Sequence, residues 1–200
     1  MIATGLSLAL AVAISAAPGA DEHLLAGARA FRDGHFEAAL VEFRVAERLG
    51  ASDAGAYAAA SLVQLGRPEE AVEAFASSPP GDDDLLDWYR ALACYDAHLY
   101  ACADRLLAGL ERAGPKAAAE VGKLRVEITR VLAPVPAKPS IDWYLARCEQ
   151  RRAEGREALA AAYCREAAEL GGRRPDRYGV ARANAEFARV GAGPASGVGK

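Results

Sequence analysis

The chain has 200 residues, a mass of 20.9 kDa and a formal net charge of −3, and 52% of its residues are hydrophobic. This length suits one domain or a short repeat array with an appended segment. The slightly acidic balance argues against nucleic acid as a general partner, because binding to phosphates needs a basic surface. Much of the hydrophobic content is alanine, which favours helices that can approach one another closely.

Charge is distributed unevenly along the chain. Residues 21–115 carry 17 acidic and 8 basic side chains, whereas residues 116–200 carry 10 acidic and 16 basic ones. The first half is therefore acidic and the second half basic. Such a division indicates halves that attract each other or that are simply solvated, and it also allows self-association between two copies.

The N-terminal segment resembles an export signal. Residues 1–20 contain no charged side chain, and an apolar run from Leu6 to Ala17 is followed by small residues and Pro18. This pattern predicts a signal peptide over residues 1–20, with the mature chain beginning between Ala16 and Asp21. The alternatives are an uncleaved membrane anchor and a buried helix. No cysteine lies near the expected cleavage site, so a lipoprotein signal is not predicted.

A helical-hairpin pattern then recurs after 32 residues. The matched pairs are Gly34 and Gly66, Phe36 and Pro68, Ala39 and Ala71, Phe43 and Phe75, and Ala46 and Ser78. A unit of this length with two short helices cannot bury its own apolar face, so it stacks on a neighbour. The repeat therefore predicts an all-α fold, a short right-handed α-solenoid of three to four antiparallel hairpins.

Periodicity and turn residues divide the rest of the chain into further helices. After the first two hairpins, at residues 21–50 and 52–77, the acidic run 82–84 is expected to cap the next helix. The predicted elements that follow are a hairpin with helices at 85–94 and 100–110, a single amphipathic helix at 116–132, a proline-rich linker at 134–139, a hairpin with helices at 140–152 and 156–170, a short helix at 178–190 and a disordered tail at 191–200. We expect residues 21–133 to form one helical unit and residues 140–190 another.

The hairpins resemble tetratricopeptide repeats, which place small residues at the helix crossing and a large aromatic residue late in the second helix. The matching residues are Gly27, Ala30, Gly34, Phe36, Ala39, Phe43 and Ala46 in the first unit, Ala59, Leu62, Gly66, Ala71 and Phe75 in the second, Ala91, Tyr100, Ala103, Leu107 and Pro115 in the third, and Ala160 and Ala167 after Gly155 in a degenerate fourth. The resemblance covers residues 21–115 well and the rest poorly. The family's tryptophan is missing from the first two units, and a generic stack of helical hairpins would give a similar pattern.

The resemblance implies a concave groove lined by the first helix of each hairpin. Its candidate residues are Phe31, Arg32, Val63, Gln64, Trp88, Leu92, Tyr95 and Asp96. Trp88 and Tyr95 would anchor a bound helix or peptide, or they would fill the seam with the preceding hairpin. Because the first half is acidic, the expected partner is a protein or peptide of basic character, or the basic segment 116–182 of a second copy. A membrane is expected as a partner only if the N-terminal segment stays uncleaved.

The four cysteines are symmetric about two predicted turns. Cys94 and Cys102 centre on residue 98, and Cys148 and Cys164 centre on residue 156. Facing positions in an antiparallel hairpin are symmetric about its turn, so we predict one disulfide within each hairpin. The alternatives are four reduced thiols, or a metal site formed by Cys94, His98 and Cys102. The metal site requires that the helix continue through His98.

Catalytic motifs are missing from the sequence. It contains no GxSxG, Walker or GxGxxG motif, and its only histidines are His23, His35 and His98. The acidic run 82–84 could bind a cation, but we interpret it as a solvated helix cap. We therefore expect no enzyme activity, cofactor or metal. The predicted function is a protein-interaction module, exported and set in a bacterial periplasm, and the alternatives are a membrane-anchored envelope-assembly subunit or a Cys/His metal or redox protein.

Overall fold

The computed structural model describes residues 19–78, 83–113, 115–133 and 139–173. All regular secondary structure in these ranges is α-helical, which confirms the predicted all-α class. The predictions for the export signal, the linker, the short helix at 178–190 and the C-terminal tail fall wholly or largely outside the described residues. No helix in the described ranges is both long and apolar enough to span a bilayer.

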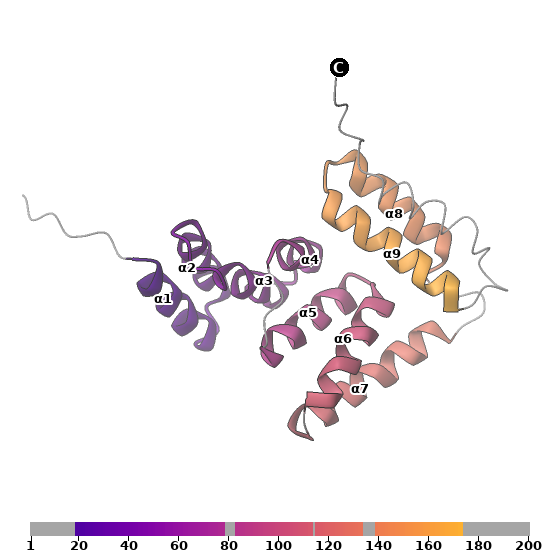
Figure 1. Cartoon of the computed structure of the whole chain (residues 1–200), viewed down its shortest axis with the longest axis horizontal. Helices are drawn as coiled ribbons and strands as arrows, with labels where there is room; N and C mark the ends of the chain where they lie inside the picture. The colour runs from indigo at the N-terminus through magenta and orange to yellow at the C-terminus, as the bar shows by residue number, and fades with distance from the viewer. Residues whose placement is uncertain (1–18, 79–82, 114, 134–138, 174–200) are drawn as a thin grey trace, which may run out of the picture.

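Eight of the helices described here pair as antiparallel hairpins, and one stands alone (Figure 1). They are α1 (Ala20–Arg32) with α2 (Phe36–Arg48), α3 (Ala54–Gln64) with α4 (Pro68–Ser77), α5 (Asp84–Asp96) with α6 (Tyr100–Ala113), the single α7 (Pro115–Leu132), and α8 (Ile141–Ala153) with α9 (Glu157–Arg173). These bounds follow the sequence prediction closely, because glycine, proline and acidic residues mark both ends of most elements.

One turn geometry joins the two helices of every hairpin. Gly34, Gly66, His98 and Gly155 have φ of 80°, 67°, 62° and 74°. The amide that follows each of them bonds to a carbonyl five residues earlier, as His35 does to Ala30. This bond satisfies a carbonyl at the end of the first helix. His98 is the only non-glycine residue in the described ranges with this backbone conformation, and it continues the 32-residue spacing of Gly34 and Gly66.

The first turns of α4 and α5 are also determined by residues of the local sequence. Pro68 occupies the first turn of α4, where its missing N–H leaves no intrahelical bond unmade. At α5 the Asp83 carboxylate accepts a hydrogen bond of 2.9 Å from the Leu85 amide, so the acidic run provides the predicted cap.

Small side chains allow the first three hairpins to pack closely. Helix α3 is buried on almost every side and contacts α2, α4 and α5. Between α1 and α2, Gly27 lies against the ring of Phe43, and a Cβ at Gly27 would come within 2.7 Å of that ring. The order of contacts, α2 with α3, then α3 and α4 with α5, is that of stacked hairpins. The solenoid arrangement and its right-handed sense stay predictions.

The C-terminal hairpin packs across earlier helices. Helix α9 contacts α4 and α6, whereas α7 packs against α6. Figure 1 shows α8 and α9 next to α4, α5 and α6. The hairpin α8–α9 therefore lies against the second helices of the second and third hairpins.

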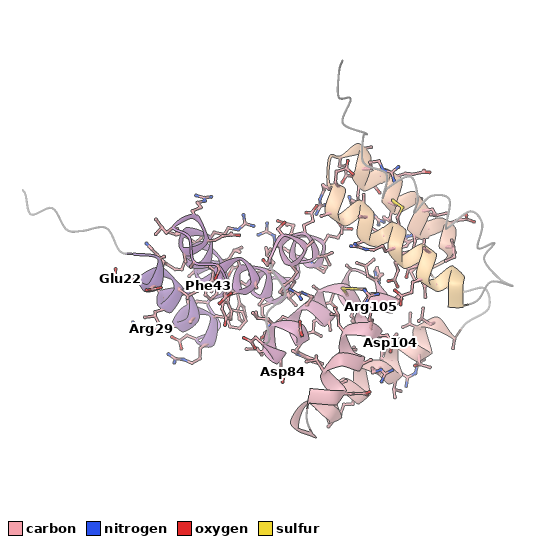
Figure 2. All side chains as sticks on the ribbon, in the orientation of Figure 1. Glu22, Arg29, Phe43, Asp84, Asp104 and Arg105 are labelled. Atoms are coloured by element: carbon pink, nitrogen blue, oxygen red, sulfur yellow. A yellow bond between two sulfur atoms is a disulfide. The ribbon has the colours of Figure 1, made fainter. Side chains whose placement is uncertain are left out.

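Both cysteine pairs lie at disulfide distance in the predicted pairing. The Cα atoms of Cys94 and Cys102 are 6.0 Å apart, and those of Cys148 and Cys164 are 5.4 Å apart (Figure 2). By restricting the unfolded chain, each bond is expected to add about 2–3 kcal/mol to the free energy of unfolding. The helix ends at Asp96, so Cys94, His98 and Cys102 do not share one helical face.

Replacement of the alanines at the helix crossings should destabilise the fold. Ala39 and Ala71 are completely buried. We expect Ala39→Leu and Ala71→Leu each to lower the free energy of unfolding by about 1–3 kcal/mol, because a larger side chain has no room there. Urea denaturation measures the change. Ala38→Leu is the matched control, because Ala38 is exposed on the same helix as Ala39, and equal stability of all three variants would contradict the packing.

Candidate functional site

The first helices of the three stacked hairpins meet at Tyr89. Its ring lies edge-on to Phe31, with centroids 5.6 Å apart, and its hydroxyl accepts a hydrogen bond of 3.2 Å from Gln64 Nε2. Phe31 also packs against Phe36 at 5.3 Å. Tyr89 therefore joins α1 and α3 to α5 on the surface where the sequence predicts a groove. Neither the repeat pattern nor the family resemblance singles out Tyr89.

The other predicted groove residues divide into exposed and packed side chains. Arg32, Gln64 and Asp96 are exposed. Trp88, Leu92 and Tyr95 are half-buried against the core, and Tyr95 contacts Tyr100 at a centroid distance of 5.7 Å. Val63 differs from the expectation, because its side chain is buried within the core. Helix α3 packs against neighbours on most of its surface, so it presents little side chain to a ligand.

A polar cavity of about 450 Å³ lies at the turn ends of the hairpins. We call it the turn-edge cavity. Its walls come from the α3–α4 turn with the first turn of α4, from the α5–α6 turn, and from α8 and α9. Residues of three hairpins thus meet there, although they are far apart in the sequence. Asp96 is the only predicted groove residue on its wall.

Aromatic contacts fix one wall of the turn-edge cavity. The guanidinium carbon of Arg147 lies 5.2 Å from the ring centroid of Trp143, which is a cation–π arrangement. The ring of His98 lies edge-on to Trp143 at 5.9 Å. The hydroxyl of Tyr144 donates a hydrogen bond of 2.7 Å to the His98 carbonyl. This bond holds α8 against the α5–α6 turn.

Asp96 brings a carboxylate to this cavity. Its side chain makes no hydrogen bond or ion pair with any other residue that the structure describes. Burial raises the pKa of Asp96, and the nearby charge of His98 lowers it by less. An exposed carboxylate that lacks a fixed partner is available to a cationic group of a ligand.

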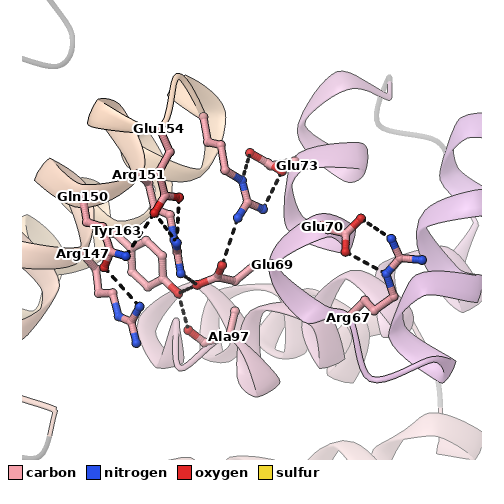
Figure 3. A network of polar contacts seen from close by, with 11 residues as sticks. Arg67, Glu69, Glu70, Glu73, Ala97, Arg147, Gln150, Arg151, Glu154 and Tyr163 are labelled. Carbon is pink, nitrogen blue, oxygen red and sulfur yellow. Dashed lines mark hydrogen bonds and ion pairs between the residues drawn. The ribbon is translucent and has the colours of Figure 1, made fainter.

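A network of charges lies beside these aromatic residues, and Tyr163 joins the two, with its ring 5.9 Å from that of Trp143 (Figure 3). The Glu69 carboxylate accepts hydrogen bonds from Tyr163 Oη and Arg151 Nη2, both at 2.8 Å, and from Arg156 Nη1 at 3.2 Å. Arg156 also donates two bonds to Glu73, at 3.0 and 2.7 Å. Acidic residues of α4 therefore pair with basic residues at the α8–α9 turn. The opposite charges of the two halves of the sequence thus meet within one chain.

The pKa values in this network shift with its contacts. Burial raises the pKa of Glu69, but the hydrogen bonds from Tyr163 and Arg151 and the charge of Arg156 outweigh it, so the pKa is lower than usual. Burial and the hydrogen bond to Glu69 raise the pKa of Tyr163 well above its ordinary value. Glu69 is therefore ionised, and Tyr163 remains a neutral donor, at neutral pH.

A second glutamate joins α9 to α6. Glu166 is only 2% exposed, and its two carboxylate oxygens accept hydrogen bonds from the amides of Ala101, at 2.5 Å, and Cys102, at 3.0 Å. These are amides of the first turn of α6, where Leu99 precedes the helix and offers no side-chain acceptor. Glu166 therefore caps α6 from another hairpin. Nothing in the local sequence around α6 indicates this contact.

The described walls of the turn-edge cavity offer charged and aromatic side chains. Among its described lining residues none is Ser, Thr, Cys or Lys, and the Tyr163 hydroxyl is held by Glu69. Within the described ranges, no group of three or more His, Cys, Asp or Glu side chains is placed to hold a metal ion. The described side chains of the cavity can contact a charged or an aromatic group of a ligand.

No family model, curated protein or solved structure matches this chain. Function is therefore inferred from its own residues.

The charge network gives a pH-dependent prediction. We expect Glu69→Gln to lower the free energy of unfolding by about 1–3 kcal/mol at pH 7, because it weakens three charge-assisted hydrogen bonds. The folded-state pKa of Glu69 lies below its ordinary value of 4.5. Its contribution is therefore complete above about pH 4.5 and is lost as the pH falls through the folded-state value.

Urea denaturation of the wild type and of Glu69→Gln at pH 7 and in acid measures this loss. The difference between the two proteins should shrink in acid. Glu37→Gln is the control, because Glu37 is exposed on α2. A Glu69→Gln effect of the same size at both pH values would show that the carboxylate charge does not stabilise the interface.

Proposed function

We propose that this chain is a non-enzymatic interaction module, similar to tetratricopeptide-repeat proteins, that binds a peptide segment of basic character. The observation that carries the proposal is the Asp96 carboxylate, which lies in the turn-edge cavity without a hydrogen-bond or ion-pair partner in the described part of the chain. The cavity around this carboxylate is formed by turns and helices of three hairpins. This arrangement is typical of a binding surface presented by a helical-repeat scaffold.

The aromatic residues of the cavity supply the remaining contacts for a peptide. Trp143 offers an aromatic surface, and His98 lies beside it at the α5–α6 turn. A Lys or Arg side chain of the ligand would place its cation near Asp96 and its aliphatic stem against the aromatic ring. Gln64, at the end of α3, is exposed at an equivalent turn end and would extend the contact along the peptide.

An exported setting fits the cysteines and the N-terminal sequence. Two cysteine pairs at disulfide distance need an oxidising compartment to form their bonds. The apolar run from Leu6 to Ala17 supports export by a cleaved signal peptide. We infer a periplasmic module, in which the disulfides reinforce hairpins whose alanine-rich core buries little area per residue.

The proposal predicts a preference for basic peptides that depends on Asp96. On an array of peptides that vary in Lys and Arg content, the wild type should select basic members. Asp96→Asn should raise the dissociation constant of a selected peptide about tenfold, because a charge-assisted contact contributes about 1.4 kcal/mol to binding. Binding should also weaken as the pH falls through the pKa of Asp96, since protonation removes the charge.

Fluorescence anisotropy with one labelled basic peptide measures these constants. Asp33→Asn is the control, because Asp33 lies at the α1–α2 turn and does not line the cavity. Circular dichroism verifies that both variants fold. Selection of neutral or acidic peptides, or unchanged affinity in a folded Asp96→Asn variant, would overturn the proposal.

A further inference from the structure

We propose that a second cavity binds a small amphiphile with an apolar chain and one anionic head, such as a medium-chain carboxylate. This cavity has a volume of about 320 Å³ and lies between α4, α5, α6 and α9. We call it the inter-helix cavity. It is separate from the turn-edge cavity, so the inference does not depend on the proposed function.

The interior of the inter-helix cavity is largely apolar. Its walls include the side chains of Val72, Phe75, Leu99, Ala158 and Ala162 and the disulfide of Cys94 with Cys102. The two alanines of α9 face larger side chains of α4 and of the α5–α6 turn, and this difference in size leaves the space. Its volume lies within the range of about 300–1,000 Å³ that is typical of small-molecule sites.

Two arginines line the cavity, and one of them, Arg165, brings a positive charge that is unpaired within the described part of the chain. Arg165 of α9 is exposed and makes no hydrogen bond or ion pair with any residue in the described ranges. Arg90 of α5 lies over the ring of Phe75, at 5.2 Å from its centroid, and contacts Asp87 at 3.3 Å. These contacts leave Arg90 Nε buried and without an acceptor.

The guanidinium of Arg165 indicates the charge of the ligand, because a cation at the edge of an apolar cavity favours an anionic partner. A carboxylate of the ligand would accept hydrogen bonds from guanidinium groups in a geometry that arginine favours. A neutral head would leave the positive charge uncompensated, and a cationic head would be repelled by Arg165.

The apolar part of the ligand follows from the remaining wall. An alkyl chain would contact Val72, Phe75 and the alanines of α9 and would displace water from an apolar surface. A strongly polar anion such as inorganic phosphate would gain the arginine contacts alone. The site therefore requires both parts, an alkyl chain and an anionic head, in one molecule.

Calorimetric titration of the full chain with three chain-matched compounds tests the proposal. The compounds are octanoate, octanol and octylammonium, each below its aggregation concentration. Octanoate should bind with a stoichiometry of one and at least about tenfold more tightly than octanol, since the carboxylate adds charge-assisted bonds. Octylammonium should bind more weakly than octanol.

Two substitutions locate the binding. Arg165→Gln should weaken octanoate binding about tenfold and leave octanol binding nearly unchanged. Ala162→Leu should fill the cavity and weaken the binding of both compounds. Arg29→Gln is the matched control, because Arg29 is exposed on α1, outside this cavity.

The outcomes separate the proposal from nonspecific binding. If the three compounds bind equally, or if Arg165→Gln leaves octanoate affinity unchanged, the proposal is wrong. Thermal denaturation verifies that Ala162→Leu folds. If it does not fold, the surface variant Arg165→Gln decides the question alone.

Discussion

Docking of the C-terminal hairpin depends on two glutamates that accept hydrogen bonds across the interface. Glu166 of α9 accepts two amide hydrogen bonds at the start of α6, and Glu69 of α4 accepts three bonds from α8 and α9. Removing a carboxylate from water is unfavourable unless charge-assisted hydrogen bonds replace its hydration. The positive end of the α6 dipole adds to this compensation at Glu166. The hairpin therefore has one favourable position, in which both carboxylates are satisfied.

Both cavities exist because the hairpin occupies that position. Trp143 and Arg147 of α8 close the turn-edge cavity against the α5–α6 turn, and Ala158 and Ala162 of α9 close the inter-helix cavity against α4. The first three hairpins alone would present these surfaces as open faces of the stack. The disulfides hold the two hairpins that meet at this interface, Cys94 with Cys102 on one side and Cys148 with Cys164 on the other. Their placement reinforces the elements that position Asp96, Arg90 and Arg165.

Local features of the sequence predicted much of the fold, whereas the contacts between distant parts of the chain could not be predicted from the sequence. The turns at Gly34 and Gly66, the cap at Asp83 and both cysteine pairings depend on neighbours in the chain, so periodicity and symmetry were sufficient to identify them. The division of charge predicted that acidic and basic halves would attract. It could not predict that Glu69 would meet Arg151 and Arg156, because 82 and 87 residues separate them. Of the predicted groove residues, Val63 proved buried, since a helix that packs on most sides has no free face.

Hydrogen exchange at the start of α6 tests the docking of the hairpin most directly. The amides of the first helical turn lack intrahelical acceptors and normally exchange quickly. Glu37 and Ala38 provide an internal reference, because they hold the equivalent positions in α2, which has no side-chain cap. With Glu166 bound to Ala101 and Cys102, we predict that these two amides exchange far more slowly than those of Glu37 and Ala38. Equal, fast exchange at all four amides would show that Glu166 does not cap α6 and that the hairpin is not docked as described.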